Sequence, residues 1–246
     1  MKSVYLAWRD PAKRWYPVGE LSFDGRVYRF RYLAGSADAE REAGFRPLVS
    51  FPAFDEEYAS EDLFPTFENR IPSPAHADYL AYMDWLALPV GERDDLAVLA
   101  RSGAARATDL FEVFPRPERT ADGRYVVHVF AHGLRHLPEA AKARAMELES
   151  GESLDLVPEP ENPVDPLALR KHTGDGVHVG YVPRYLVQDL HALRGTVTVT
   201  VERVNLPPAP IQFRLLCRIE APWPDGFSPC SGELFAPRAA TPAAHT

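Results

Sequence analysis

The chain has 246 residues, 46% of them hydrophobic, which is enough for one large domain or two small ones with apolar cores. Its formal net charge of −8 argues against a protein that coats duplex DNA through a broadly positive surface, but is compatible with a local site for a nucleic-acid end. No apolar run is long enough to span a bilayer, and the first residues lack a signal-peptide pattern, so we expect a cytoplasmic protein.

Cysteines and prolines narrow the architecture further. Cys217 lies in an apolar run and is predicted to be a core residue, whereas Cys230 lies near the C-terminal end. Neither position indicates a disulfide framework or a zinc knuckle. Most of the 24 prolines stand between short apolar runs, which predicts a chain rich in strands and loops, with short helices.

The first part of the chain predicts strands joined by tight turns, followed by two helices. Asp24-Gly25 is a hairpin signal, because glycine accepts the positive φ of a primed turn. Apolar residues three and four apart favour amphipathic helices in two later segments, the second ending at Gly103. The expected strands are residues 4–8, 18–23 and 27–33, an extended segment is expected at 47–54, and helices are expected at 76–88 and 93–104.

The second part follows a segment, residues 114–123, whose prolines, charges and final glycine are typical of a linker. Strands without long helices between them favour a small, partly closed β-barrel with helices over its openings. The expected strands are residues 124–130, 153–157, 167–171, 177–182, 196–204 and 211–221, and the expected helices are 138–151 and 183–193.

Three motifs of the second part occur in a fixed order: HGLRHLP at 132–138, EPENPVDPLAL at 159–169 and GYVPRYLV at 180–187. Together they resemble the HIRAN domain, a small β-barrel module found alone in bacteria and fused to helicase-type remodellers in eukaryotes. The run from Asn162 to Asp165, asparagine-proline-x-aspartate, is the most specific of the matching patterns. The resemblance covers roughly residues 125–222 and implies an OB-like fold.

The resemblance to HIRAN domains also implies capture of the 3′ end of single-stranded DNA. In that mode Asp165 accepts a hydrogen bond from the terminal 3′-hydroxyl, and Phe213 supplies a stacking surface. Tyr181 and Arg184 fall where a polar ring and a cation approach phosphate. The residues to which the resemblance assigns nucleic-acid contacts are Arg135, His136, Asn162, Asp165, Tyr181, Arg184 and Phe213.

Some of these residues have alternative roles. Asn162 and Asp165 each precede a proline, where their side chains are suited to capping backbone amides of a tight turn. One carboxylate can brace the turn and contact DNA as well, because it accepts several hydrogen bonds. A solvated side chain is the alternative for Arg135. Val164 and His136 stand where end-binding members of the family carry aromatic residues.

The first part carries a second resemblance. VGELSFDGRVYRFRYL, PLVSFP and DLFPTFENRIP are similar to the N-terminal lobe of HipA-type toxin kinases, over about residues 15–115. The chain shows no glycine-rich phosphate loop and no pair of catalytic base and metal-binding asparagine, so only this accessory lobe is expected. We therefore expect a HipA N-terminal-lobe-like domain at 1–116, a HIRAN domain at 124–222 and a mobile tail at 223–246.

A metal site is a further alternative. The second half is rich in histidine, and Asp155, Glu159, Glu161 and Asp165 cluster in sequence, which leaves a metal-dependent hydrolase open. The histidine spacings, however, do not form a close chelating pair with cysteine or carboxylate support. We therefore expect no cofactor, with zinc or another divalent metal as the alternative.

The combined prediction is an α+β fold, in which a small N-terminal β-sheet with two helices precedes an OB-like β-barrel with short helices. The predicted function is non-catalytic nucleic-acid binding, with single-stranded DNA or DNA ends as the partner and no membrane contact. The alternative is a protein-interaction module of a toxin–antitoxin or defence system, in which the N-terminal lobe contacts a protein partner.

Overall fold

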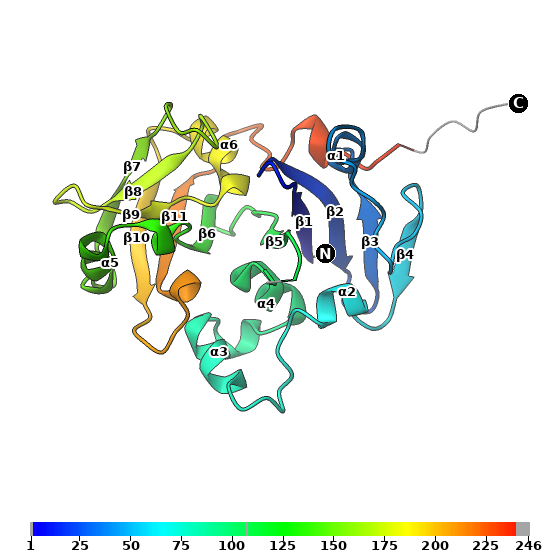
Figure 1. The fold of residues 1–246 in the computed structure, drawn as a ribbon, viewed down its shortest axis with the longest axis horizontal. Helices are drawn as coiled ribbons and strands as arrows, with labels where there is room; N and C mark the ends of the chain where they lie inside the picture. Colours follow the sequence, from blue (N-terminus) through cyan, green and yellow to red (C-terminus); the bar gives the residue numbers. More distant parts are fainter. Residues whose placement is uncertain (1, 107, 240–246) are drawn as a thin grey trace, which may run out of the picture. The chain divides into compact units, whose positions relative to one another are not determined.

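The computed structural model describes residues 2–106 and 108–239 (Figure 1). Contacts within the chain divide it into two compact units. Unit 1 comprises the described residues of 1–76, 88–116 and 230–246, and unit 2 comprises 77–87 and 117–229. This division differs from the linear one expected from the sequence, since residues 77–87 group with unit 2 and the last segment groups with unit 1.

Unit 1 is built on an antiparallel five-stranded sheet with the order β4-β3-β2-β1-β5. The predicted hairpin at Asp24-Gly25 joins β2 to β3. Gly25 has a φ of +99°, and the Asp24 carboxylate accepts hydrogen bonds from the backbone N–H groups of Arg26 and Val27. The strands are β1 (Lys2–Arg9), β2 (Trp15–Phe23), β3 (Tyr28–Tyr32), β4 (Glu57–Ser60) and β5 (Phe111–Pro115).

The helices of unit 1 are short. In α4 the Asp94 carboxylate caps the N-terminus by accepting from the Ala97 N–H. Gly103 ends the helix in the left-handed conformation, at the predicted position. The segment at 47–54, expected to be extended, is a turn closed by a bridge between Leu48 and Phe51. The helices are α1 (Gly35–Ala43), α2 (Pro65–Glu68) and α4 (Asp95–Ser102), with 3-10 turns η1 (Val90–Glu92) and η4 (Glu233–Phe235).

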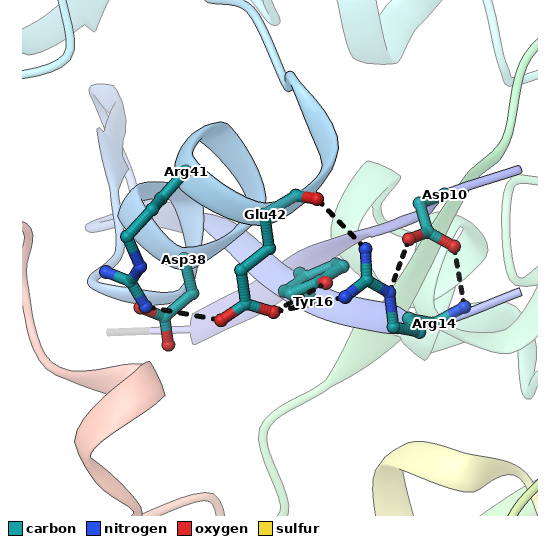
Figure 2. A network of polar contacts seen from close by, with 6 residues as sticks. All are labelled: Asp10, Arg14, Tyr16, Asp38, Arg41 and Glu42. Atoms are coloured by element: carbon teal, nitrogen blue, oxygen red, sulfur yellow. Dashed lines mark hydrogen bonds and ion pairs between the residues drawn. The ribbon is translucent and has the colours of Figure 1, made fainter. Parts of the chain in front are cut away.

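A polar network fixes α1 to the β1–β2 turn (Figure 2). Arg14 lies between Asp10, which accepts from its Nε at 2.7 Å, and the backbone carbonyl of Glu42, which accepts from its Nη2 at 3.1 Å. The Tyr16 hydroxyl donates to the Glu42 carboxylate at 3.1 Å. Because Asp10 is buried and charge-paired, this network braces the fold.

The chain after Pro222 is packed, which differs from the mobile tail expected from the sequence. In unit 2, Trp223 and Phe227 pack on Tyr125 with ring centroids 6.2 and 6.1 Å away. In unit 1, Phe235 packs edge-on against Tyr5 at 5.0 Å. Single aromatic residues within a segment rich in proline and small residues supply these contacts. Residues 240–246 of the expected tail lie outside the described residues.

Unit 2 is a curled six-stranded sheet with the order β6-β11-β10-β7-β8-β9. The edge strand β9 is joined to the chain after β6 by a bridge between His132 and Tyr181, so the sheet forms a half-barrel that matches the OB-like fold expected. Its strands are β6 (Arg124–Phe130), β7 (Ser153–Pro158), β8 (Leu169–His172), β9 (His178–Tyr181), β10 (Thr198–Val204) and β11 (Leu215–Pro222).

Three helices complete unit 2. Arg203 of β10 pairs with Asp84 at 2.6 Å, and Asn205 donates to the Trp85 carbonyl at 2.8 Å, so α3 packs on this unit although it precedes it in sequence. In the part of the chain that the structure describes, no helix is long and apolar enough to cross a membrane. The helices are α3 (Tyr79–Trp85), α5 (Glu139–Met146) and α6 (Arg184–Ala192), with 3-10 turns η2 (Leu134–His136) and η3 (Ile211–Phe213).

Candidate nucleic-acid interface

The loop between β7 and β8 is folded by the side chain of Asn162. Its Oδ1 accepts from the N–H groups of Val164 at 2.9 Å and Asp165 at 3.0 Å. The Asp165 Oδ1 in turn accepts from the N–H of Leu167 at 3.0 Å. Both side chains therefore brace consecutive turns, which is the structural role that their position before proline predicted.

Glu159 joins this loop to β8 and β9. Its Oε2 accepts from Asn162 Nδ2 at 2.6 Å and from the Tyr181 hydroxyl at 3.0 Å, and its Oε1 lies 3.6 Å from Arg170 Nη1. The hydrogen bond from Asn162 is the largest cause that lowers the pKa of Glu159 below its ordinary value. The sequence placed Glu159 only in an acidic cluster. Its position three residues before Asn162 is the sequence feature that could have predicted a contact between the two side chains within a turn.

Asp165 also contacts the first residue of α6. Arg184 Nε lies 3.3 Å from Asp165 Oδ2, and the two side chains are 39% and 15% exposed. Each carboxylate oxygen of Asp165 thus has one protein partner. A carboxylate has about four acceptor positions, so this group keeps capacity for a further donor.

Tyr181 is fixed through its backbone as well as through its hydroxyl. Its N–H and C=O pair with His132 at 2.8 and 3.0 Å, and its C=O also accepts from Lys171 Nζ at 2.7 Å. Gly133 has a φ of +75°, and a Cβ there would lie 3.0 Å from the Tyr181 ring. The loop after β6 therefore lies directly against Tyr181, and glycine permits this approach.

Arg135 and His136 lie on that loop, in η2. Both are exposed, and Arg135 Nε donates to His136 Nε2 at 3.0 Å. The pairing of His132 with Tyr181 brings the loop that carries them beside Tyr181. The structure thus connects Asn162, Asp165, Tyr181 and Arg184 through direct contacts and places Arg135 and His136 on the adjoining turn.

Phe213 is a correction to the predicted site. Its side chain is only 8% exposed and packs against Phe130 at 5.2 Å and Tyr82 at 5.8 Å, so it belongs to the core and offers no stacking face. The predicted strand 211–221 begins only at residue 215, and Phe213 lies in η3, which turns its ring inward. The exposed apolar side chains beside Asp165 are instead Val164, 54% exposed, and Leu167, 44% exposed.

The acidic and histidine clusters do not form a chelating site. Over residues 2–106 and 108–239, no group of three or more histidine, cysteine, aspartate or glutamate side chains is placed to hold a metal ion. His128 pairs with Glu202 at 3.6 Å, and His172 packs on His178. Glu159 is occupied by the loop contacts described above.

These features define a small half-barrel with a fixed polar corner at one edge. Residues 125–223 match the family model described as HIRAN domain, and this part of the chain is a HIRAN domain. The match does not extend to the first 124 residues, so their resemblance to the N-terminal lobe of HipA-type kinases stays a prediction. No curated protein matches the chain.

Two solved structures are similar to part of the chain. The crystal structure of the HIRAN domain of human HLTF is 16% identical, covers 42% of this chain and 81% of its own, and has a TM-score of 0.30. The crystal structure of a protein from Lactobacillus plantarum is 22% identical, covers 40% of this chain and 97% of its own, and has a TM-score of 0.31.

Proposed function

We propose that the HIRAN domain of this protein binds the 3′ end of single-stranded DNA, with Asp165 accepting a hydrogen bond from the terminal 3′-hydroxyl. The observation that carries the proposal is the state of the Asp165 carboxylate. It is fixed by the Leu167 N–H and by Arg184, and is 15% exposed. A rigid, partly accessible acceptor is what a terminal hydroxyl needs, because little conformational entropy is lost when it binds.

The surroundings of Asp165 supply the other contacts that a DNA end requires. Arg184 begins α6, whose N-terminus has no side-chain cap and carries the positive end of the helix dipole. Arg135 adds an exposed cation on the adjoining loop. Val164 and Leu167 offer apolar surface to the terminal sugar or base. This local arrangement is compatible with the net charge of −8, since end binding needs only a few cations.

The proposal is tested by fluorescence anisotropy with a short single-stranded oligonucleotide that ends in a 3′-hydroxyl or a 3′-phosphate. We expect the hydroxyl end to bind at least about tenfold more tightly, because a phosphate has no hydroxyl to donate and is repelled by the carboxylate. Asp165→Ala is expected to remove this preference, with a loss of about 10- to 100-fold for the hydroxyl end.

The matched control is Asp225→Ala, which removes an exposed carboxylate elsewhere in unit 2 and is expected to leave both affinities unchanged. Equal affinity of the wild type for the two ends contradicts end capture. Unchanged affinity in Asp165→Ala contradicts the assignment of the acceptor.

A further inference from the structure

The outer face of β7, β8 and β9 carries polar and aromatic residues next to the proposed site. Two rows of paired residues cross the three strands, and the β8–β9 pairing has a register shift between them. Alternation explains most of the rows: Leu154, Lys171 and Val179 point into the core and are buried, so their neighbours along each strand point outward. Tyr181, two residues after Val179, pairs with Arg170 because of the register shift. The rows are Asp155, His172 and His178, and Val157, Arg170 and Tyr181.

The rings of these rows form a continuous series that ends at the proposed site. His172 and His178 stack with centroids 5.5 Å apart and planes 17° apart, and His178 meets Tyr181 edge-on at 4.7 Å. All three side chains are half-buried. Tyr181 is shared with the Asp165 corner through Glu159, so the series continues that corner onto the face of the sheet.

The same face concentrates nitrogen atoms without a protein partner. Three buried side-chain nitrogen atoms lie here without a hydrogen-bond partner: Arg170 Nε, His172 Nε2 and His178 Nε2. A buried polar atom left unpaired costs about 1–3 kcal/mol, so three nitrogen atoms on one face indicate a surface suited to a bound polar group. Each imidazole can donate from Nε2 in the tautomer that carries its proton there.

The charges that face this cluster decide what kind of acceptor fits. Asp155 and Glu159 contribute carboxylates from the β7 side, and Arg170 contributes the one guanidinium of the two rows. Burial, His172 and Arg170 lower the pKa of His178 below its ordinary value of 6.5, so its ring is neutral near pH 7 and acts as a hydrogen-bond partner without charge. Glu159 occupies Arg170 Nη1, so the unpartnered Arg170 Nε and the two imidazoles suit a group with several acceptor oxygens and no more than one negative charge, and a phosphodiester has this chemistry.

We propose that Arg170, His172 and His178 form a subsite for a backbone phosphate of single-stranded DNA, at a nucleotide further from the 3′ end than the one held at Asp165. This inference rests on the proposed function, because it continues the path of the same strand from Tyr181. The subsite carries no base preference, since its donors contact phosphate alone.

The experiment uses the full chain and oligonucleotides of about eight nucleotides, each with one uncharged methylphosphonate linkage at a different position. In the wild type, neutralising the linkage at the subsite is expected to weaken binding about fivefold. In His172→Ala/His178→Ala the same linkage is expected to have a smaller effect, about twofold, because two of the three donors are gone and Arg170 remains. Affinity for a dinucleotide, which is too short to reach the subsite, is expected to be equal in both proteins.

His128→Ala is the matched control, since His128 is a half-buried histidine on β6 of the same unit, and it is expected to keep the wild-type pattern. If the alanine pair unfolds, His172→Gln/His178→Gln replaces it as the test together with Arg170→Met. The glutamine pair keeps a donor at each position and is expected to keep the sensitivity, whereas Arg170→Met is expected to lose it.

A linkage effect that persists unchanged in the alanine pair, or in Arg170→Met, overturns the subsite while leaving end binding at Asp165 in place. No binding of any oligonucleotide by the wild type contradicts the proposed function itself, and the subsite with it.

Discussion

Glu159 holds the proposed site together, because one carboxylate oxygen accepts from both Asn162 and Tyr181. Glu159→Gln replaces the carboxylate with a neutral amide, whose oxygen is a weaker hydrogen-bond acceptor for both donors. We expect the free energy of unfolding to fall by about 1–2 kcal/mol, and the affinity for a DNA end to fall about 3- to 30-fold as the Asp165 turn loosens. Urea denaturation and anisotropy measure the two effects.

The pH dependence of Glu159→Gln gives an independent check. The folded-state pKa of Glu159 lies below its ordinary value of 4.5, so its contribution to stability is present above that value and is lost as pH falls through the folded pKa. The variant is expected to show a weaker loss of stability in this acid range. Glu161→Gln, exposed and two residues away, is expected to behave as the wild type. An identical acid profile for wild type and Glu159→Gln counts against this role.

Lys171 is a fully buried cation in the barrel core, with 0% exposure and a hydrogen bond from its Nζ to the Tyr181 carbonyl. Burial lowers its pKa from 10.5 to about 8. Between these values the unfolded chain binds more protons than the folded one, so stability rises with pH through that window. The shift corresponds to a penalty of about 3 kcal/mol that is fully present below pH 8.

Lys171→Met is therefore expected to raise the free energy of unfolding near neutral pH by about 1–3 kcal/mol, after the lost hydrogen bond is allowed for. It is also expected to remove the rise in stability of the wild type from pH 8 upward. Urea denaturation over this pH range measures both. Lys142→Met on α5 is the control, and a variant Lys171→Met that keeps the wild-type slope contradicts the assignment.

The closure of the half-barrel depends on one contact between elements, the pairing of β9 with the chain after β6. Gly180 has a φ of +123°, and a Cβ there would lie 3.0 Å from both the Ala131 Cβ and the His132 oxygen. Gly180→Ala is expected to destabilise the protein by about 1–3 kcal/mol and to speed hydrogen exchange at the His132 and Tyr181 amides. Gly174→Ala in the β8–β9 turn, where a Cβ meets nothing within 4 Å, is expected to be neutral. Slow exchange retained in Gly180→Ala argues against this closure.

Some secondary-structure elements could be predicted from the sequence, and others could not. Strands such as β10 follow from strict alternation, and α4 follows from its apolar spacing and its glycine end. Helix α1 was missed, because its buried face consists of Gly35, Ser36 and Ala39 and so gives no apolar period. The elements β4 and α2 have four residues each, which is too short for a period to be recognised in the sequence.

The turn contacts of the candidate site were predictable from the motif, whereas the burial of its side chains, which packing decides, was less so. Asn162 and Asp165 were marked by the prolines that follow them, and the structure shows both in the expected turn contacts. Lys171 was missed because a charged side chain is ordinarily expected in solvent, although alternation with the buried Leu169 places it on the inner face. The burial of Phe213 depends on where β11 begins, which an apolar run alone does not define.

At the scale of the whole molecule, the chain passes from unit 1 to unit 2 after β5 and forms most of unit 2. It returns to unit 1 at residue 230. Arg238 fixes that return: its Nη2 donates to Glu40 at 2.6 Å, and its guanidinium lies 3.8 Å from the centroid of the Phe54 ring. The last described segment is thus part of the unit 1 fold.

Removing these contacts is expected to affect one unit only. Phe235→Ala/Arg238→Ala is expected to lower the stability of unit 1 by about 2–4 kcal/mol, through lost aromatic packing and a lost charged hydrogen bond. Calorimetry is expected to show the unit 1 transition moved to lower temperature and the unit 2 transition unchanged. Glu233→Ala, exposed in the same segment, serves as the control. A thermogram in which both transitions move together speaks against two separately folding units.

The proposed capture of a DNA end differs from binding of single-stranded DNA anywhere along its length. The measurement that separates the two is competition between a linear single-stranded oligonucleotide and its circular form of the same sequence, at one salt concentration. The circle has the same bases and phosphates but no terminal hydroxyl for Asp165. We predict that the linear form binds at least about tenfold more tightly and that Asp165→Ala removes the difference. Equal affinity for the circle and the linear strand contradicts capture of a DNA end.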